Sequence, residues 1–233
     1  MKFSFVSLFP ELISGYFNDS ILKRAIEANR LSIEYINPRD FSNDKFNRVD
    51  DKAVGGGAGM VMFPQPLFAA LSDLKRDADV HIIFTTPVAK PFNQKDAKRL
   101  AKKKHIAFVS GRYEGIDERV IENFADEVFS IGDYILTGGE LPSLVMADAI
   151  SRNVDGVLGN QNSLEVESFE SHLLEAPSFA KPSEYEGLSS PSEFHKGNHS
   201  KILALKTILS EYKTKYFRPD ELIKHHKRTN YEK

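Results

Sequence analysis

The sequence predicts an α/β fold in which a mostly parallel sheet is flanked by helices. Three short apolar runs carry this prediction, at 80–86, 105–111 and 127–132. Each has the length of a buried strand, and helical patterns lie between them. Buried strands that alternate with helices indicate a sheet that is covered on both faces. From this pattern alone, the expected strand order is that of an unknotted, flavodoxin-like sheet.

The part of the chain before these runs also contains strand and helix patterns. Residues 2–7 and 31–36 alternate apolar with polar side chains, which is typical of strands. Helix starts are expected at Pro10, at Asn18 or Asp19, and at Pro64 or Pro66. Residues 37–52 are polar and show neither the alternation of a strand nor the spacing of a helix.

Further helices are expected in the rest of the chain, at 93–104, 116–124, 139–151, 199–212 and 219–226. The last two follow Asn198 and begin at Pro219, which are residue types that start helices. Between 159 and 172 the chain is rich in Asn, Ser and Glu, which indicates a linker. We therefore expect a first domain over 1–158, an interdomain linker over 159–172 and a small helical domain over 173–233.

The composition excludes several kinds of site. The chain of 233 residues has no cysteine, which rules out disulfides, thiolate nucleophiles and cysteine-bound zinc. No secretory signal and no run of membrane-spanning length is visible, so a cytoplasmic protein without membrane attachment is expected. From His172 onward there are 11 Lys and Arg against 8 Asp and Glu, although the whole chain has a net charge of −2. This basic end is compatible with a phosphate-binding surface or with an ordinary solvated one.

The glycines Gly55, Gly56, Gly57 and Gly59 form a dense local cluster. A Walker loop would require Gly-Lys followed by Ser or Thr, and here Met60 follows the last glycine. A dinucleotide fingerprint would require another glycine at position 62, where the chain has Met. Two interpretations remain: a backbone loop that closely approaches a partner or ligand, and a plain flexible loop.

The loops that follow the apolar runs contain the strongest candidates for a ligand site. They are TTP (85–87), SGRYEGIDERVI (110–121) and SIGDYILTGGE (130–140). In an open α/β sheet, ligands bind beyond the carboxyl ends of the strands. The glycine stretches contain no lysine, so such a pocket suits a neutral adenine ring and a sulfonium cation better than a polyphosphate. Three ordinary turns are the alternative interpretation.

Two of these segments, GRYEGIDERVI (111–121) and SIGDYILTGGELP (130–142), closely resemble the signature of bacterial tRNA (guanine-N1)-methyltransferases. Further matching motifs are SLFPE at 7–11, PRDF at 38–41, VDDKAVGGGAGM at 49–60, SR at 151–152, GVLG at 156–159 and GNH at 197–199. The resemblance runs in register over nearly the whole chain, and its motifs are long and specific. On these motifs the chain is identified as a member of this family.

The resemblance implies properties that the spacing does not show. Members of the family have the trefoil-knotted SPOUT fold, act as homodimers with a shared active site, and methylate N1 of the guanine 3′ of the tRNA anticodon with S-adenosylmethionine. By position, the resemblance assigns the cofactor pocket to Pro87, Gly111, Tyr113, Glu114, Ile131, Gly132, Asp133, Tyr134, Ile135, Leu136, Gly138 and Gly139. It also associates the enzyme with Mg²⁺, although no metal-ligand cluster is visible in the sequence.

The resemblance places two catalytic side chains outside these loops. Arg152 matches the arginine that faces the guanine, where negative charge grows on O6 when the N1 proton is removed. The family's base is an aspartate, and Glu167 occupies its position in EVESF (165–169). A glutamate carboxylate reaches about 1.5 Å further than an aspartate carboxylate. Glu165 is the alternative base, and a solvated linker acid is the alternative role for Glu167.

RNA contacts are expected at the glycine cluster and at His199, which could instead cap the helix that begins beside it. A basic and aromatic set near the C-terminus also fits an RNA-backbone surface: Lys213, Lys215, Arg218, Lys224, Lys227 and Arg228 with Tyr212, Tyr216 and Phe217. Two other functions stay open, a knotted methyltransferase that acts on a ribose hydroxyl and a binding protein without turnover. Arg152 favours a base nitrogen over the ribose, because a ribose hydroxyl has no O6-like charge to stabilise. The glutamate at position 167 favours the binding protein.

Overall fold

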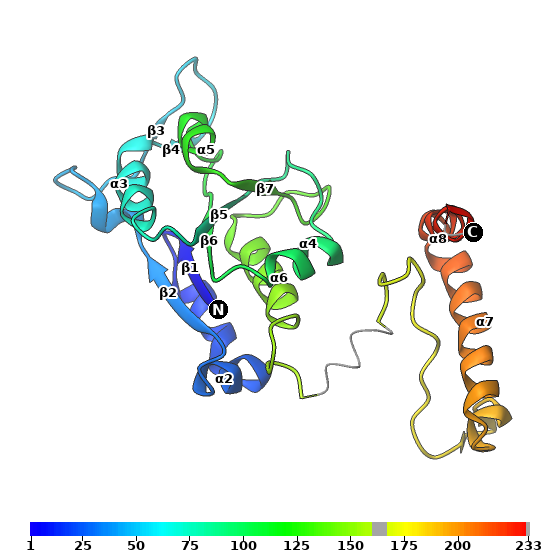
Figure 1. The fold of residues 1–233 in the computed structure, drawn as a ribbon. Coiled ribbons are helices and arrows are strands. Elements are labelled where there is room, and N and C mark those ends of the chain that lie inside the picture. Colours follow the sequence, from blue (N-terminus) through cyan, green and yellow to red (C-terminus); the bar gives the residue numbers. More distant parts are fainter. Residues whose placement is uncertain (160–166, 232–233) are drawn as a thin grey trace. The chain divides into compact units, whose positions relative to one another are not determined.

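The chain consists of two compact units in a computed structural model that describes residues 1–159 and 167–231, with side chains described up to residue 227. The units are Met1–Gly159 and Asn160–Lys233. The first contains the large sheet and the second contains the C-terminal helices (Figure 1).

The first unit is built on a parallel sheet of five strands. In spatial order they are β2 (Ser32–Ile36), β1 (Lys2–Val6), β6 (His105–Ser110), β5 (Val80–Thr85) and β7 (Glu127–Phe129). The three apolar runs form β5, β6 and β7, and the two alternating segments form β1 and β2. The predicted parallel α/β sheet is therefore confirmed.

The strand order differs from the flavodoxin-like order that the pattern suggested. A flavodoxin-like sheet would place β5, the third of these strands along the chain, beside β1. Instead β6 pairs with β1, and β5 lies one place further out, between β6 and β7. Periodicity could not decide between the two orders, because β5 and β6 are both apolar runs that suit a central position.

The helices of the first unit are α1 (Glu11–Ser14), α2 (Ser20–Glu27), α3 (Pro64–Leu74), α4 (Gln94–Leu100), α5 (Glu118–Phe124) and α6 (Glu140–Ser151). Short 3-10 helices cover Gly15–Asn18 and Pro38–Phe41. Asp19 is the N-cap of α2, and Pro64 begins α3. The helix expected over 93–104 ends at Leu100, because Lys104 already joins the sheet through its carbonyl, which accepts from the Lys2 N–H at 2.8 Å.

Side chains of β6 alternate between two hydrophobic cores. Ile106 and Phe108 lie in one core with residues of α2, α4 and α6. Ala107 and Val109 lie in the other core with residues of α3 and α5. Figure 1 shows these two groups of helices on opposite faces of the sheet. Burial on both faces explains why the central strands are continuous apolar runs in the sequence.

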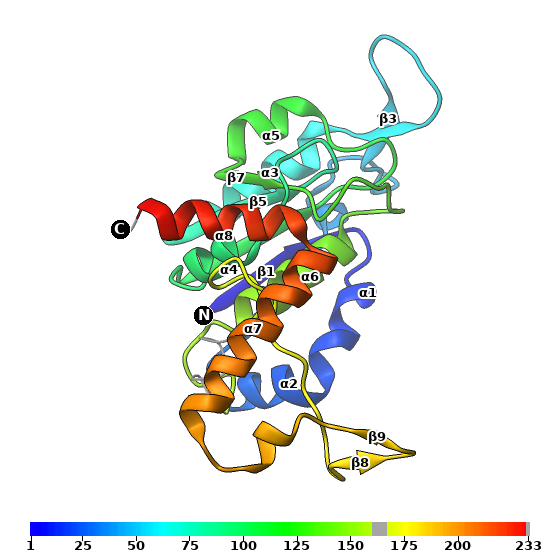
Figure 2. The same ribbon diagram turned by 90° about the vertical axis from the view of Figure 1, so that its right-hand side faces the viewer.

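A small hairpin, which the sequence did not predict, holds the glycine cluster. Its strands β3 (Asp50–Lys52) and β4 (Met60–Met62) pair antiparallel, and the glycines lie in the loop between them. Figure 2 shows this loop extending away from the sheet. Three-residue strands are too short to give a recognisable period, which is why the polar stretch 37–52 gave no signal.

The second unit contains two long helices and a small hairpin. The helices are α7 (His199–Phe217) and α8 (Pro219–Tyr231), and the hairpin consists of β8 (Glu184–Tyr185) and β9 (Leu188–Ser189). Asn198 caps α7, since its side chain accepts from the Lys201 N–H. Both helices begin where the sequence predicted and run further. None of the helices in the described part of the chain has the length and apolar character that a membrane crossing needs.

Candidate functional site

A pocket of about 410 Å³ lies at the carboxyl ends of β5, β6 and β7. Eleven of the twelve residues expected to hold the cofactor line it: Pro87, Gly111, Tyr113, Glu114, Ile131, Gly132, Tyr134, Ile135, Leu136, Gly138 and Gly139. Asp133 is exposed and is not among the lining residues. The fold therefore gathers three strand-end loops around one cavity.

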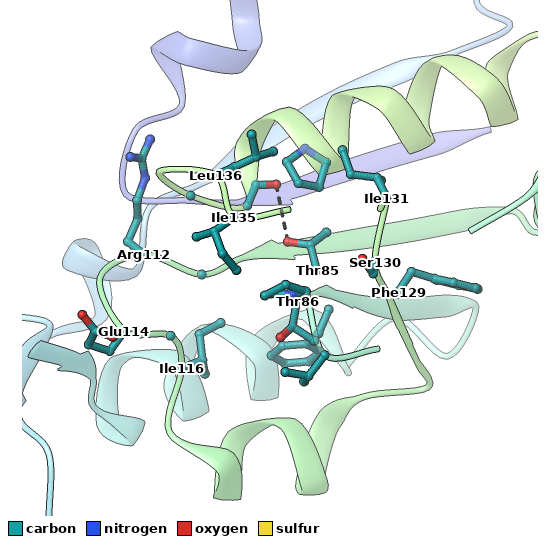
Figure 3. A pocket seen from close by; sticks show the side chains of 18 of the residues that line it. Thr85, Thr86, Arg112, Glu114, Ile116, Phe129, Ser130, Ile131, Ile135 and Leu136 are labelled. Atoms are coloured by element: carbon teal, nitrogen blue, oxygen red, sulfur yellow. Dashed lines mark hydrogen bonds between the residues drawn. The ribbon is translucent and has the colours of Figure 1, made fainter. Parts of the chain in front are cut away.

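The walls of this pocket are largely apolar. Figure 3 shows Ile131, Ile135 and Leu136 from the loop after β7, together with Thr85 and Thr86 at the end of β5. The sequence contained a signal for both threonines, because TTP follows directly on an apolar run. Apolar walls with a few oriented polar groups are the usual surroundings of a ring-shaped ligand.

The charges around the pocket favour a cationic ligand group. Glu114 and Glu118 are among the lining residues, and no lysine is found among the described residues of the lining. Arg112 also lines the pocket, but its guanidinium is paired with a carboxylate. A polyphosphate would meet like charges here, whereas an adenine ring with a sulfonium or ammonium group would meet apolar walls and carboxylates. The residues present therefore fit S-adenosylmethionine.

Gly139 lines the pocket, and hydrogen bonds hold its backbone in place. Its N–H donates to the Gly111 carbonyl at 2.9 Å. Its carbonyl accepts from Ser143 Oγ at 2.8 Å and from Thr85 Oγ1 at 3.4 Å (Figure 3). A Cβ at position 139 would lie 2.7 Å from Ser110 Cα and would also collide with the Thr85 hydroxyl. The start of α6 can approach β6 this closely only because residue 139 is glycine.

We expect Gly139→Ala to destabilise the first unit by about 1–3 kcal/mol, the usual cost of overpacking, since the added methyl meets backbone that cannot move aside. Gly111→Ala is the matched control. A Cβ at Gly111 would meet the Ile116 side chain at an ordinary 3.5 Å, so its free energy of unfolding should stay close to that of the wild type. Urea unfolding measures both. Equal stability of the two variants would contradict the close approach of α6 to β6.

An ion pair between the buried Glu140 and the partly buried Arg112 connects the loops around the pocket. Arg112 Nε lies 3.1 Å from Oε1 and 3.0 Å from Oε2 of Glu140, which is 2% exposed. The Ser7 hydroxyl donates to the same carboxylate at 2.7 Å, and the Arg112 guanidinium donates to the Thr137 carbonyl at 3.1 Å. The loops after β1, β6 and β7 are thus tied together beside the cavity.

Sequence reasoning did not single out this ion pair. Both charged residues lie inside the quoted motifs, in GRYEG and GGELP. A carboxylate in the first turn of a helix is favoured by the helix dipole even at the surface, so the sequence position of Glu140 does not indicate its burial. Its burial depends on the packing of α6 against β6, which no local pattern reveals.

The glycine loop is joined to the pocket through β4. The Glu114 N–H donates to the Met60 carbonyl at 2.9 Å, and the Met62 N–H donates to the Gly115 carbonyl at 3.0 Å. A Cβ at Gly59 would lie 2.6 Å from the Glu114 side chain. Gly59 thus lies against a pocket residue, and this contact does not decide between a loop that approaches a partner or ligand and a plain flexible loop. Gly55, Gly56 and Gly57 are exposed in the loop, and a Cβ on any of them would meet no atom within 4 Å.

Arg152 lies far from the pocket of its own chain. It follows the last residue of α6, whereas Gly139 at the pocket precedes the first. The helix has 12 residues. At the rise of an α-helix this length spans about 18 Å. Within one chain the structure therefore does not bring Arg152 to the pocket.

The candidate base Glu167 is partly buried and begins a turn in the second unit. Glu165, the alternative base, lies outside the described residues. His199 is the exposed first residue of α7. It does not cap the helix, because the capping side chain is that of Asn198.

Metal ligands do not cluster in the part of the chain that the structure describes. No group of three or more His, Cys, Asp or Glu side chains there could hold a metal ion. Among the described residues, Mg²⁺ would therefore have to be held by fewer than three such side chains, which is usual for this ion.

Known proteins resemble this chain over nearly its full length. A family model described as tRNA (Guanine-1)-methyltransferase TrmD matches residues 1–225. A tRNA (guanine-N(1)-)-methyltransferase of Sulfurimonas denitrificans is 73% identical over 226 residues, which are 97% of this chain and 98% of the relative. Proteins of the same name from Sulfurovum sp. and Campylobacter jejuni are 66% and 58% identical, over 94% and 98% of this chain and 97% and 100% of the relatives. The range that the family model matches spans the first unit and most of the second.

Proposed function

Because the chain belongs to the tRNA (guanine-1)-methyltransferase family, we propose that it transfers a methyl group from S-adenosylmethionine to N1 of the guanine immediately 3′ of the tRNA anticodon. The observation that carries this proposal is the pocket at the carboxyl ends of β5, β6 and β7. Its apolar walls and carboxylates fit the two halves of the cofactor, a flat adenine and a cationic sulfonium with its amino acid tail.

S-adenosylmethionine supplies an electrophilic methyl group when it is bound. The loop after β7, with Ile131, Ile135 and Leu136, would hold the adenine. Glu114 and Glu118 would provide negative charge for the cationic part of the cofactor. The Arg112–Glu140 pair keeps the loops in place, so the cavity is formed before the ligand arrives.

Guanine N1 carries a proton at neutral pH, so it is not nucleophilic until that proton is removed. We assign the removal to the Glu167 carboxylate, which would accept the proton and so free the N1 lone pair for the methyl group that bound S-adenosylmethionine would supply. The Arg152 guanidinium stabilises the negative charge that grows on guanine O6. No step is assigned to a metal ion.

A homodimer would complete the site. Arg152 is separated from its own pocket by the length of α6, so a second chain is the natural source of this side chain. Large apolar side chains on α1, α6 and the adjoining turn are exposed in the single chain: Phe9, Leu12, Tyr16, Leu141 and Val145. α1 packs against α6, which places these residues on neighbouring elements. An exposed apolar surface of this kind favours a subunit interface.

The family's trefoil knot is part of the proposal and is supported by the path of the chain after β7. The Phe92 N–H donates to the Ser130 carbonyl at 2.8 Å, so this path first runs beside the loop that follows β5. It then reaches the end of β6, where Gly139 bonds to Gly111. A segment that crosses from the edge of the sheet to its centre in this way is what a threaded chain requires.

Transfer RNA would bind through the second unit and the glycine loop. The exposed Tyr212 and Tyr216 offer stacking surfaces, and Lys213 and Lys215 lie on the same helix. Gly55, Gly56 and Gly57 can approach a phosphate backbone closely because they have no side chains. His199 is exposed at the start of α7 and is available for a phosphate contact. A tRNA substrate is consistent with the expected cytoplasmic location.

The test is to incubate the protein with isotopically labelled S-adenosylmethionine and unmodified tRNA, and then to map the methyl group by nuclease digestion. We expect 1-methylguanosine at the position 3′ of the anticodon and no label in the same tRNA with adenine at that position. Label on a ribose hydroxyl would identify the other knotted methyltransferase. Cofactor binding without transfer would identify a binding protein.

A further inference from the structure

The residues from Glu167 to Glu175 form a compact turn that is closed by its own hydrogen bonds. The Phe169 N–H donates to the Leu173 carbonyl at 2.9 Å, and the Glu175 N–H donates to Ser168 Oγ at 3.0 Å. These bonds lock the backbone that immediately follows Glu167. The direction of the Glu167 side chain therefore depends on how this turn is held.

The helices α7 and α8 hold the turn through its backbone. The Leu174 N–H donates to Thr214 Oγ1 at 2.8 Å, and the Thr214 side chain is fully buried in α7. His225 Nδ1 lies 2.7 Å from the Ser171 carbonyl and must be the donor, because a carbonyl only accepts. The turn is thus fastened to both helices.

Two residues of the turn adopt a strained backbone conformation. Phe169 and His172 have φ values of 76° and 61°, which is unfavourable for residues with a side chain. Their side chains are held by the junction of α7 and α8 and by α8 itself. The Arg218 guanidinium lies 5.5 Å from the centre of the Phe169 ring, and the His172 Nδ1–H donates to Glu221 Oε2 at 2.8 Å. Strained backbone that is held from outside is characteristic of functional segments.

Glu221 is the buried centre of these contacts. It is 7% exposed, and besides His172 it accepts hydrogen bonds from Lys224 at 2.6 Å and from Arg218 at 3.4 Å. Burial raises the pKa of the Glu221 carboxyl, but the hydrogen bonds from Lys224 and His172 outweigh burial and hold the pKa below its usual range. The carboxylate is therefore charged at neutral pH and is a strong acceptor for the His172 ring.

We propose that His172 and Glu221 are positioning residues that aim the Glu167 carboxylate at the guanine N1 proton. This inference rests on the proposed function, since it takes Glu167 as the base. Their contact fixes the left-handed backbone at His172, and the hydrogen bonds of the turn transmit that geometry to Glu167. A displacement near 1 Å can cost about 100-fold in rate. A loosened turn would therefore slow proton removal and leave the cofactor pocket in the other unit intact.

Three substitutions of His172 separate positioning from folding. In His172→Asn the side-chain amide can donate from the place of Nδ1, and Asn tolerates a positive φ. His172→Gly has no donor, but glycine adopts this φ without cost. His172→Leu lacks the donor and keeps the unfavourable φ. If the contact acts only through stability, the glycine variant should be more active than the leucine variant, because glycine relieves the strain that leucine keeps.

The readouts are the single-turnover methyl-transfer rate constant at saturating tRNA and S-adenosylmethionine, the calorimetric affinity for the cofactor, and the thermal midpoint. We expect His172→Gly and His172→Leu to lower the rate constant by about 10-fold, a fraction of the loss for complete misplacement, with unchanged cofactor affinity. His172→Asn should stay near the wild-type rate. His172→Gly should be more stable than His172→Leu, because it relieves the strained φ, and yet equally slow, a divergence that a purely structural role would not give.

Glu193→Gln is the matched control, because it removes a glutamate of the same unit that pairs with Lys196 at 3.3 Å away from the turn. Its rate should be that of the wild type. Glycine and leucine variants with wild-type rates, in a protein that Glu167→Gln inactivates, would overturn the positioning role and leave the proposed function intact. If the wild type transfers no methyl group to guanine N1, the proposed function itself fails.

Discussion

Glu167→Gln is expected to lower the single-turnover rate of methyl transfer by about 100-fold or more, the usual order for the loss of a general base. The amide has nearly the same shape as the carboxylate but cannot accept the N1 proton. Affinity for S-adenosylmethionine should not change, because the pocket residues belong to the first unit and Glu167 belongs to the second. Rapid-quench measurement with saturating tRNA and labelled cofactor gives the rate directly.

Two further variants make this test decisive. Glu167→Asp restores the family's residue at the cost of about 1.5 Å of reach. Near wild-type activity would mean that the turn follows the geometry of the family, and a large loss would mean that the turn has adjusted to a glutamate. Glu165→Gln is the control for the neighbouring acid. A large loss there, with Glu167→Gln active, would move the base two residues upstream and refute the assignment.

The strands and the loops that form the pocket were predictable because burial produces a recognisable apolar pattern in the local sequence. Residues 106–109 are all apolar because β6 is covered on both faces. This pattern is visible in the sequence without any knowledge of the neighbouring strands. Since parallel strands end at the same edge of a sheet, the residues after them had to come together. The fold class and the place of the pocket followed from these two facts.

The features that were missed depend on contacts between distant segments. The position of β5 between β6 and β7 is a choice among equally apolar strands, so the order was predicted wrongly. The hairpin around the glycine loop consists of strands too short to show a period. The burial of Glu140 depends on a glycine at 139 that lets α6 approach β6, and such a close approach is visible only in three dimensions.

The position of Arg152 is the structural reason to expect a site shared between two chains. Gly139 and Arg152 are at opposite ends of α6, as its N-cap and its C-cap. No rotation of an Arg152 side chain could cover about 18 Å, the length that 12 residues of α-helix span. Either Arg152 serves the pocket of a partner subunit or it does not take part in the reaction.

Paired heterodimers decide between these possibilities. Arg152→Ala should lower the rate by about 100-fold or more, because the charge on O6 then lacks its fixed partner. Gly111→Val should abolish cofactor binding while the chain stays folded, because the first added atom meets the Ile116 side chain at 3.5 Å and Gly115 Cα at 3.9 Å, both ordinary contacts, and the larger side chain then fills the cavity. The two variants carry different affinity tags, and only the tandem-purified heterodimer is assayed, by methyl transfer to unmodified tRNA.

If the site is shared, this heterodimer should regain about half of the wild-type activity, since one of its two sites combines an intact pocket with an intact Arg152. The mirror control places both substitutions on one chain beside a wild-type chain. There each site carries one defect, so this heterodimer should be inactive. The opposite result, with the first heterodimer inactive and the control half active, would show that each chain uses its own Arg152. A monomer in sedimentation that still turns over would exclude a shared site altogether.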